Sequence, residues 1–176
     1  NNFIGAFVWD WMDQGLQQDV PDSYRHSSAR KHFYAYGGWW EEARGIPHDG
    51  NFCMNGLLAA DQTPHPGLSA IKYHYQYVAV EPVNLRQGKF RIRNRYHFSR
   101  LDKKLRGSWS LSKNGHIMKN RQIEALQIAP GQKKTVKLDL PKLEQQPGVE
   151  YFVNFSFTIP HNTFFAPAGY ELAYEQ

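Results

Sequence analysis

Residues 9–14 place tryptophan, carboxylate and amide side chains side by side, reading Trp-Asp-Trp-Met-Asp-Gln. An indole ring offers a flat apolar face, and sugar-processing proteins use such faces. Acid–base or nucleophilic catalysis by carboxylates would need a pair of them held close together. Asp10 and Asp13 are expected to be structural, tying a strand end to its loop, and the adjacent Glu41 and Glu42 diverge on a strand or a helix. The chain therefore offers groups that could contact a sugar but no catalytic carboxylate pair.

Other kinds of reactive site have little support. The single cysteine, Cys53, excludes a disulfide within the chain and supports no metal cluster. The eight histidines include no pair at metal-ligand spacing on one helix face, and neither a nucleophilic triad nor a phosphate-binding glycine loop is evident. No apolar run approaches the roughly 18 residues of a membrane span. No leader-like segment follows Asn1, which leaves the compartment open between cytoplasm and periplasm.

The elements that would position these side chains differ along the chain. Residues 3–9 form a nearly continuous apolar run, which predicts a strand buried on both faces. Residues 15–56 lack a sustained period, which predicts a long ordered loop. A helix is predicted to follow, with Thr63 as its cap and its end near Gln76. One strand and one helix cannot close a barrel, so residues 1–77 are expected to be a piece of a larger domain.

From residue 78 onward, apolar and polar residues alternate with the period of two that is typical of strands. The apolar positions are Phe90, Ile92, Tyr96, Phe98, Trp109, Leu111, Val136, Leu138, Leu140, Tyr151, Val153, Phe155, Phe157 and Ile159. Asn94 interrupts the apolar face of its strand, and Asn114-Gly115 predicts a hairpin turn. The fold class is therefore mainly β, with an antiparallel, immunoglobulin-like β-sandwich over residues 78–176.

The charge of the chain also changes near residue 78. Residues 1–77 have a net charge of −3 and residues 78–176 of +8, which together give the net charge of +5. Four basic residues between positions 89 and 95 alternate with mostly apolar ones, so they share one face of a strand. Nucleic-acid binding would need aromatic residues on that same exposed face, whereas the aromatic residues here are predicted to point inward. We therefore expect a solvated face and no nucleic-acid partner.

Four blocks resemble, in order, the end of the catalytic barrel of β-galactosidases of glycoside hydrolase family 2. They are Phe7-Val8-Trp9-Asp10-Trp11-Met12-Asp13-Gln14, Tyr36-Gly37-Gly38, Phe52-Cys53-Met54-Asn55-Gly56 and Ala60-Asp61-Gln62-Thr63-Pro64-His65-Pro66. Their joint occurrence at the family's spacing is highly specific. The resemblance implies that residues 1–77 are the C-terminal portion of a (β/α)8 barrel, with its last strand, long loop and last helix. Residues 78–176 fit the β-sandwich domain that follows the barrel.

The resemblance implies roles for three residues at a sugar site. The residue matching Trp9 forms one wall of the galactose pocket, where an indole face packs on the C–H face of the sugar. The asparagine matching Asn55 contacts the region of the galactose 6-hydroxyl and a sodium ion. The backbone carbonyl of the residue matching Phe52 is another sodium ligand, and hard oxygen ligands suit this ion. From the residues alone, Trp9 could instead fill the barrel top, and Asn55-Gly56 could be only a turn.

The resemblance places the two catalytic glutamates on earlier barrel strands, before residue 1. No catalytic residue is therefore expected in this chain, the isolated chain is expected to be inactive, and its sodium site is partial. A magnesium ion, if the whole enzyme holds one, is not expected to be bound by this chain. The expected partners are a β-galactoside, the remainder of the enzyme chain and further copies of the enzyme in a homo-oligomer, with the sandwich as spacer or interface.

One departure from the family pattern follows Gly38. The best-known members continue with Asp-Phe-Gly, whereas this chain continues with Trp39-Trp40-Glu41-Glu42. The two tryptophans could build a subsite for the leaving group or could pack the loop onto the barrel, and both interpretations stay open. The alternative functions are another specificity in the same family, such as β-glucuronidase, and a non-catalytic carbohydrate-binding β-sandwich module.

Overall fold

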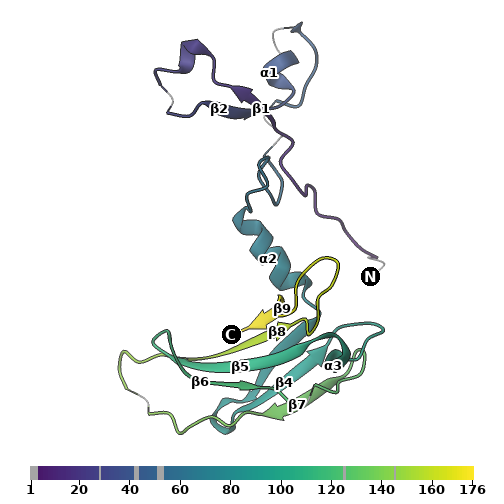
Figure 1. Cartoon of the computed structure of the whole chain (residues 1–176), viewed down its shortest axis with the longest axis vertical. Helices are drawn as coiled ribbons and strands as arrows, with labels where there is room; N and C mark the ends of the chain where they lie inside the picture. Colours follow the sequence, from purple (N-terminus) through teal and green to yellow (C-terminus); the bar gives the residue numbers. More distant parts are fainter. Residues whose placement is uncertain (1–3, 28, 42–43, 51–53, 125, 145) are drawn as a thin grey trace. The chain divides into compact units, whose positions relative to one another are not determined.

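The computed structural model describes residues 4–176 except 28, 42–43, 51–53, 125 and 145. The chain divides into two compact units, Asn1–Ile71 and Lys72–Gln176, which we call unit 1 and unit 2 (Figure 1). Antiparallel sheets make up most of the regular structure, which confirms the mainly β fold class. Among the described residues, no helix is long and apolar enough to cross a membrane.

Unit 2 is a β-sandwich of two antiparallel sheets. One sheet has the strand order β3-β4-β7 and the other has the order β6-β5-β8-β9. The strands are β3 (Val78–Asn84), β4 (Lys89–Asn94), β5 (Arg106–Lys113), β6 (His116–Gln122), β7 (Lys133–Lys137), β8 (Tyr151–Thr158) and β9 (Glu171–Glu175), with short helices η3 (Leu85–Gln87) and α3 (Leu101–Lys104) between them. The predicted hairpin turn joins β5 to β6, where Asn114 and Gly115 have φ of 47° and 83°. Positive φ at both central residues is what a two-residue hairpin of this type requires.

The core of the sandwich is formed by residues that the alternation predicted. Trp109 and Leu111 on β5, and Phe155 and Phe157 on β8, are at most 3% exposed. The ring of Phe90 on β4 meets the ring of Phe155 edge-on at 5.0 Å between centroids, so the two sheets are in direct contact. Full burial of a large apolar side chain contributes roughly 1.5–3 kcal/mol, so these residues are the main stabilising contribution in unit 2.

Asn94, which interrupts the apolar pattern, is completely buried and fully hydrogen-bonded. Its Nδ2 donates to the carbonyl oxygens of Ser99 at 2.8 Å and Ile128 at 2.9 Å. Its Oδ1 accepts from the backbone N–H of Tyr96 at 2.9 Å. A buried amide is tolerated when its polar atoms find partners, so the side chain of Asn94 ends β4 and binds two loops together.

The end of β4 at Asn94 also corrects the prediction for Phe98. That side chain is 96% exposed, because the alternation does not continue past the last residue of the strand. The core instead takes in apolar residues from helix α3 and irregular segments, which a search for alternation does not find. They are Leu101, Leu105, Leu126 and Ile128.

Lys89, Arg91 and Arg93 lie on the outer face of β4, as predicted, whereas Arg95 follows the end of the strand and is exposed. Phe90 and Ile92 are buried, whereas Arg93 is exposed and Arg91 is half-buried. Glu81 on the neighbouring strand lies opposite Arg91, with 3.9 Å between Nη1 and Oε2. The expectation of a solvated face is therefore confirmed.

Unit 1 contains more regular structure than a single long loop, so that prediction for residues 15–56 was incomplete. In the described part of this stretch lie a two-stranded antiparallel ribbon and two short helices. They are β1 (Leu16–Asp19), η1 (Asp22–Tyr24), β2 (His32–Ala35) and α1 (Gly38–Glu41).

The predicted buried strand at residues 3–9 is not formed. Residues 4–9 are exposed and belong to no strand, and the side chain of Phe7 is 101% exposed. A strand of a parallel sheet is covered on both faces and paired with its neighbours. No described segment of this chain supplies such neighbours to residues 4–9, so the apolar sequence alone does not produce the strand.

The last helix of unit 1, α2 (Pro66–Tyr75), begins later than predicted. Thr63 lies three residues before its first residue and is therefore not its cap. Thr63 instead closes the preceding turn, where its backbone N–H donates to Oδ1 of Asp61 at 2.9 Å. This hydrogen bond holds the pKa of the Asp61 carboxyl below its ordinary value.

Residues 72–77 are attached to the sandwich, so unit 2 begins before the start of β3. The hydroxyl of Tyr73 donates to the carboxylate of Glu175 at 3.0 Å. The backbone N–H of Tyr174 donates to Oε1 of Gln76 at 2.9 Å, and Gln76 is buried. The predicted boundary between residues 77 and 78 coincides with the start of β3, whereas the structural division falls within α2.

Candidate functional site

Residues 10–13 and 55–58 lie side by side in unit 1 and are joined by backbone hydrogen bonds. Met12 and Leu58 form a parallel bridge. The hydrogen bonds run from Asp10 N to Asn55 O at 3.2 Å, Leu57 N to Asp10 O at 3.0 Å, Leu58 N to Trp11 O at 3.0 Å and Asp13 N to Leu58 O at 2.8 Å. Two of the four sequence blocks therefore form one structure, which we call the paired segment.

Gly56 allows the two halves of the paired segment to approach this closely. A Cβ atom at Gly56 would lie 2.3 Å from the backbone nitrogen of Asp13 and 2.4 Å from the carbonyl carbon of Met12. No side chain fits at such distances without moving the backbone. Glycine is therefore required here for close approach of two chains, and its φ is not in the left-handed region.

Asp13 holds the paired segment from inside, as the sequence predicted. Its side chain is buried; Oδ1 accepts from the backbone N–H of Gly56 at 2.8 Å, and Oδ2 lies 2.9 Å from Nε2 of His65. Asp10 is also engaged: Oδ2 accepts from Nε2 of Gln14 at 2.6 Å. The expectation that both aspartates are structural is confirmed. Sequence reasoning missed His65 and Gly56 as partners, because 52 and 43 residues separate them from Asp13.

Asn55 is the unsatisfied residue of the paired segment. Its Oδ1 and Nδ2 are shielded from solvent, yet neither has a hydrogen-bond partner among the described residues. A buried amide without partners costs about 1–3 kcal/mol, and such groups mark strained or ligand-binding positions. Neither Asn55 nor Gly56 has the positive φ of a two-residue hairpin turn. An amide oxygen held in place without a partner fits a hard cation such as sodium, or a sugar hydroxyl.

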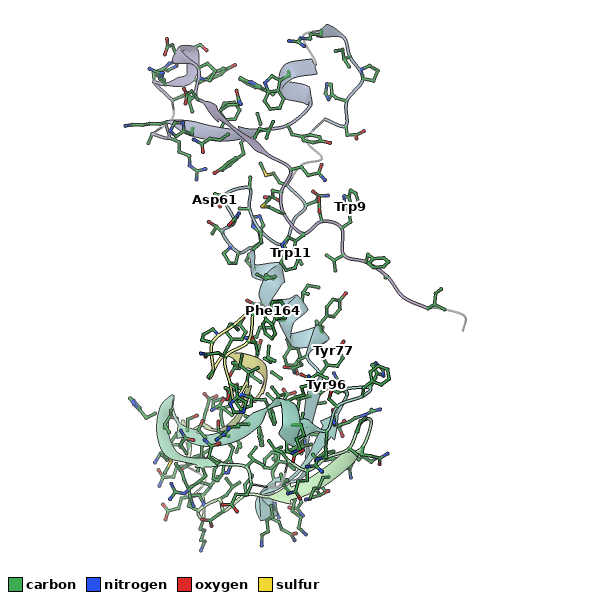
Figure 2. All side chains as sticks on the ribbon, turned by 45° about the vertical axis from the view of Figure 1, so that its right-hand side comes forward. Trp9, Trp11, Asp61, Tyr77, Tyr96 and Phe164 are labelled. Atoms are coloured by element: carbon green, nitrogen blue, oxygen red, sulfur yellow. The ribbon has the colours of Figure 1, made fainter. Side chains whose placement is uncertain are left out.

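Trp9 directly precedes the paired segment, and its side chain is 72% exposed (Figure 2). The residue after it, Asp10, donates its backbone N–H to Asn55 O at 3.2 Å. The backbone at Trp9 is therefore one residue away from a direct hydrogen bond to Asn55, while the joint sugar-binding role of the two side chains stays a prediction. The third predicted sugar-site residue, Phe52, lies outside the described residues, as does the side-chain arrangement of Glu41 and Glu42.

The two tryptophans that depart from the family pattern have different surroundings. Trp39 packs edge-on against Phe33, with 4.7 Å between ring centroids. Trp40 instead lines an open cavity of about 450 Å³ together with Tyr36 and His48. Trp39 remains 47% exposed and contacts a ring of its own loop, so both interpretations of the two tryptophans stay open.

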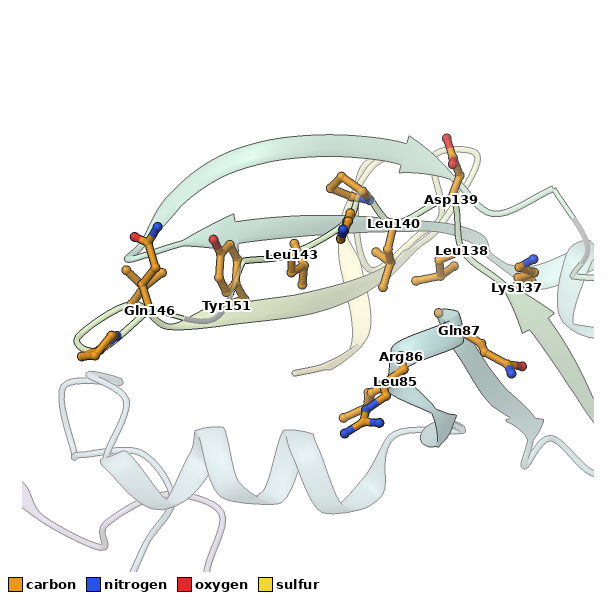
Figure 3. A pocket seen from close by; sticks show the side chains of 15 residues that line it. Leu85, Arg86, Gln87, Lys137, Leu138, Asp139, Leu140, Leu143, Gln146 and Tyr151 are labelled. Carbon is orange, nitrogen blue, oxygen red and sulfur yellow. The ribbon is translucent and has the colours of Figure 1, made fainter.

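Unit 2 contains a separate cavity of about 1400 Å³, which lies between η3 and residues 137–151 (Figure 3). Leucine side chains form much of its wall, and lysine and arginine lie at its edge. No carboxylate pair faces it, since Asp139 is its only described acidic residue and is bound to Lys119 at 2.6 Å. Within the described part of the chain, no group of three or more His, Cys, Asp or Glu could hold a metal ion.

Comparison with known proteins matches the two ends of the chain to two family descriptions. Residues 1–80 match the family described as glycosyl hydrolases family 2, TIM barrel domain, and residues 90–176 match the one described as beta-galactosidase, domain 4. A beta-galactosidase of Priestia megaterium is 36% identical over 173 residues, and one of Photobacterium profundum is 33% identical over 174 residues. A third, beta-galactosidase 2 of Enterobacter cloacae, is 31% identical over 172 residues. Each alignment covers 98% of this chain but only 16% of the relative.

Proposed function

This chain belongs to glycoside hydrolase family 2, and we propose that it is the end of the catalytic barrel and the following sandwich domain of a retaining β-galactosidase. The substrate would be a terminal β-D-galactoside. The chain would contribute Trp9, Asn55 and Phe52 to the sugar pocket, and the sandwich would act as spacer or interface. Other copies of the whole enzyme would complete a homo-oligomer.

The observation that carries this proposal is the side-chain amide of Asn55. The oxygen and nitrogen of this amide are shielded from water and have no described hydrogen-bond partner. The backbone carbonyl of Asn55 accepts a hydrogen bond from the N–H of Asp10, the residue that follows Trp9. An unsatisfied buried amide at this position lowers the stability of the fold. A galactose hydroxyl and a sodium ion would each give its oxygen a partner.

The proposed mechanism divides the work between this chain and the rest of the barrel. Trp9 would pack its indole face on the C–H face of galactose and exclude water from that side. Asn55 would orient the sugar through the region of its 6-hydroxyl, and the paired segment would hold Asn55 in register with Trp9. A sodium ion, when bound by Asn55 and the carbonyl of Phe52, supplies a fixed positive charge for hydroxyl oxygens. The nucleophile and the acid/base would be glutamates on other barrel strands, about 5 Å apart.

The test uses the whole enzyme that contains this chain. Trp9→Ala should lower kcat/KM for an aryl β-galactoside by at least about tenfold, equal to roughly 1.4 kcal/mol of transition-state binding. Asn55→Leu should weaken both galactoside binding and activation by sodium, whereas Asn55→Asp, which keeps an oxygen ligand, should retain part of the sodium activation. The isolated 176-residue chain serves as the control for the missing carboxylates and should show no turnover.

A second measurement separates ligand binding from folding. Asn55→Leu should leave the thermal stability of the whole enzyme unchanged or higher, because it removes a buried amide that has no described partner. Wild-type kinetics for Trp9→Ala would refute its role at the pocket wall. Sodium activation that survives unchanged in Asn55→Leu would refute the ligand role.

A further inference from the structure

The outer face of the four-stranded sheet in unit 2 carries two rows of hydroxyl and amide side chains. Residues directly opposite each other in antiparallel strands point to the same face of a sheet, and the inner face here is the one that buries Trp109 and Phe155. The outward rows cross β6, β5, β8 and β9, which lie side by side in that order (Figure 1). One row is Gln122, Ser108, Ser156 and Tyr174, and the other is Asn120, Ser110 and Asn154.

A cavity of about 470 Å³ lies over these two rows. Its volume is within the range of small-molecule sites, roughly 300–1,000 Å³. Neighbouring strands are about 4.8 Å apart, so a row that crosses all four strands is about 14 Å long. That length exceeds a single sugar ring, so the face is wide enough for part of an oligosaccharide.

The cavity lacks cationic side chains although unit 2 as a whole is strongly basic. Residues 78–176 have a net charge of +8, and the outer face of the other sheet carries basic residues such as Arg93. Among the described residues that line the cavity there is no Lys, Arg or His, and the charged ones are Glu171 and Glu175. These carboxylates repel a phosphate or a carboxylate, so the face suits an uncharged ligand.

One of the two carboxylates fixes the direction of a hydroxyl on the face. Ser156 Oγ donates to Oε2 of Glu171 at 2.5 Å, and Nζ of Lys72 lies 3.7 Å from the other oxygen of that carboxylate. Because its proton is engaged, the oxygen of Ser156 presents its lone pairs as acceptors. Lys72 does not line the cavity, so its charge is directed at Glu171.

The second row supplies donors and further hydroxyl groups. Nε2 of Gln176 donates to Oδ1 of Asn154 at 2.7 Å, which leaves Nδ2 of Asn154 as a donor. The hydroxyls of Ser108 and Ser110 have no hydrogen-bond partner among the described residues. A sugar hydroxyl both donates and accepts, so a face with directed donors, directed acceptors and unpaired hydroxyls matches its chemistry.

We propose that the outer face of this sheet binds an uncharged oligosaccharide through the hydroxyl and amide groups of its two rows. A protein partner fits less well, because protein interfaces centre on apolar side chains. Among the described residues that line the cavity, Ile117 is the only exposed aliphatic one. The site lies wholly within unit 2, so binding there does not depend on the hydrolytic reaction proposed above.

The experiment titrates the 176-residue chain with three uncharged tetrasaccharides, namely those of β-1,4-linked galactose, glucose and xylose. Tetragalacturonate, which carries a carboxylate on every sugar, is the acidic counterpart. Calorimetry should show binding of at least one uncharged sugar. Tetragalacturonate should bind at least about tenfold more weakly, equal to roughly 1.4 kcal/mol, because Glu171 and Glu175 repel it.

Three variants locate the bound sugar. Ser110→Arg places a long cation in the middle of the face and should weaken binding at least about tenfold. Thr135→Arg makes a comparable change on the outer face of the other sheet, where Thr135 lies opposite Arg91, and should leave binding unchanged. Asn154→Ala only shortens a side chain and should weaken binding about threefold, as expected for one lost hydrogen bond.

The outcomes that overturn the site are distinct. They are no binding of any of the three uncharged sugars, equal binding by Ser110→Arg and the unsubstituted chain, or an equal loss in Thr135→Arg. Loss of binding in Trp9→Ala with Ser110→Arg unaffected would assign the sugar to unit 1 and would also overturn the proposal. Affinity electrophoresis of the whole enzyme, in a gel that contains the matching polysaccharide, should show the same difference between Ser110→Arg and Thr135→Arg. Its absence would mean that another part of the enzyme covers the face, which would overturn the proposal as well.

Discussion

Unit 1 and unit 2 bury their apolar residues to very different extents. Unit 2 has a continuous core in which side chains such as Ile92 and Leu111 are 0% exposed. In the described part of unit 1, the buried apolar residues are Val20 and Ala35, while Phe7 is fully exposed. The sandwich strands present one apolar face to each other, so unit 2 completes its own core. The apolar run of unit 1 is apolar on both faces and needs neighbouring strands, which no described segment of this chain provides.

The two units also differ in how they accommodate a buried asparagine amide. Asn94 in unit 2 and Asn55 in unit 1 are amides with shielded side-chain atoms. Asn94 has three hydrogen bonds to the backbone, whereas Asn55 has none among the described residues. An asparagine side chain therefore has a structural role where the fold supplies its hydrogen-bond partners, as at Asn94. Where the described residues supply none, as at Asn55, its amide is available for a ligand.

The largest expected effect comes from dividing the chain. Residues 72–176 should unfold cooperatively as a separate protein, because they contain the whole core and the Tyr73–Glu175 and Gln76–Tyr174 contacts. Residues 1–60 should show no cooperative transition in circular dichroism or calorimetry. Limited proteolysis of the intact chain should cut residues 4–11 long before residues 150–159. Equal protection of these two segments would show that unit 1 closes a core of its own.

An intermediate effect is expected from matched phenylalanine substitutions in the two units. Phe157→Ala should lower the free energy of unfolding of the chain by about 3–5 kcal/mol, as is usual for a buried aromatic residue. Phe7→Ala should change it by less than about 0.5 kcal/mol, since that ring is fully exposed. Urea titration monitored by fluorescence measures both. A large cost for Phe7→Ala would mean that the segment packs in solution and would contradict the contrast between the units.

The smallest effect is expected from surface charge in unit 2. Arg100 donates to both oxygens of Asp102 at 2.7 and 2.8 Å, and these bonds lower the pKa of Asp102 below its ordinary 3.8. A lowered folded-state pKa stabilises the protein above the unfolded value, and this contribution is lost as the pH falls through the folded value. Asp102→Asn should therefore lower the Tm at pH 7 by about 2 °C or less. The difference should shrink as the pH falls below 3.8, the ordinary pKa of the carboxyl. A larger loss, or one that does not depend on pH, would contradict this electrostatic origin.

Much of the sandwich was predictable from the sequence, because its strands follow local rules. Alternation identified Phe155 and Phe157 as core residues, since successive side chains of a strand point to opposite faces. Asn114-Gly115 identified a turn because few residue pairs tolerate positive φ at both positions. The error at Phe98 has the same origin, since alternation does not indicate where pairing stops.

The candidate site was predictable only as a set of separate blocks. The sequence by itself determined that Trp9, Asn55 and Asp13 belong to blocks of one family, and that Asp13 is structural. Only the tertiary structure decided that Gly56 and His65 are the partners of Asp13, and that the amide of Asn55 is left unsatisfied beside them. Such contacts join residues that are far apart in the sequence. Local periodicity and propensity cannot predict them, because the contacts depend on which backbone segments approach each other closely.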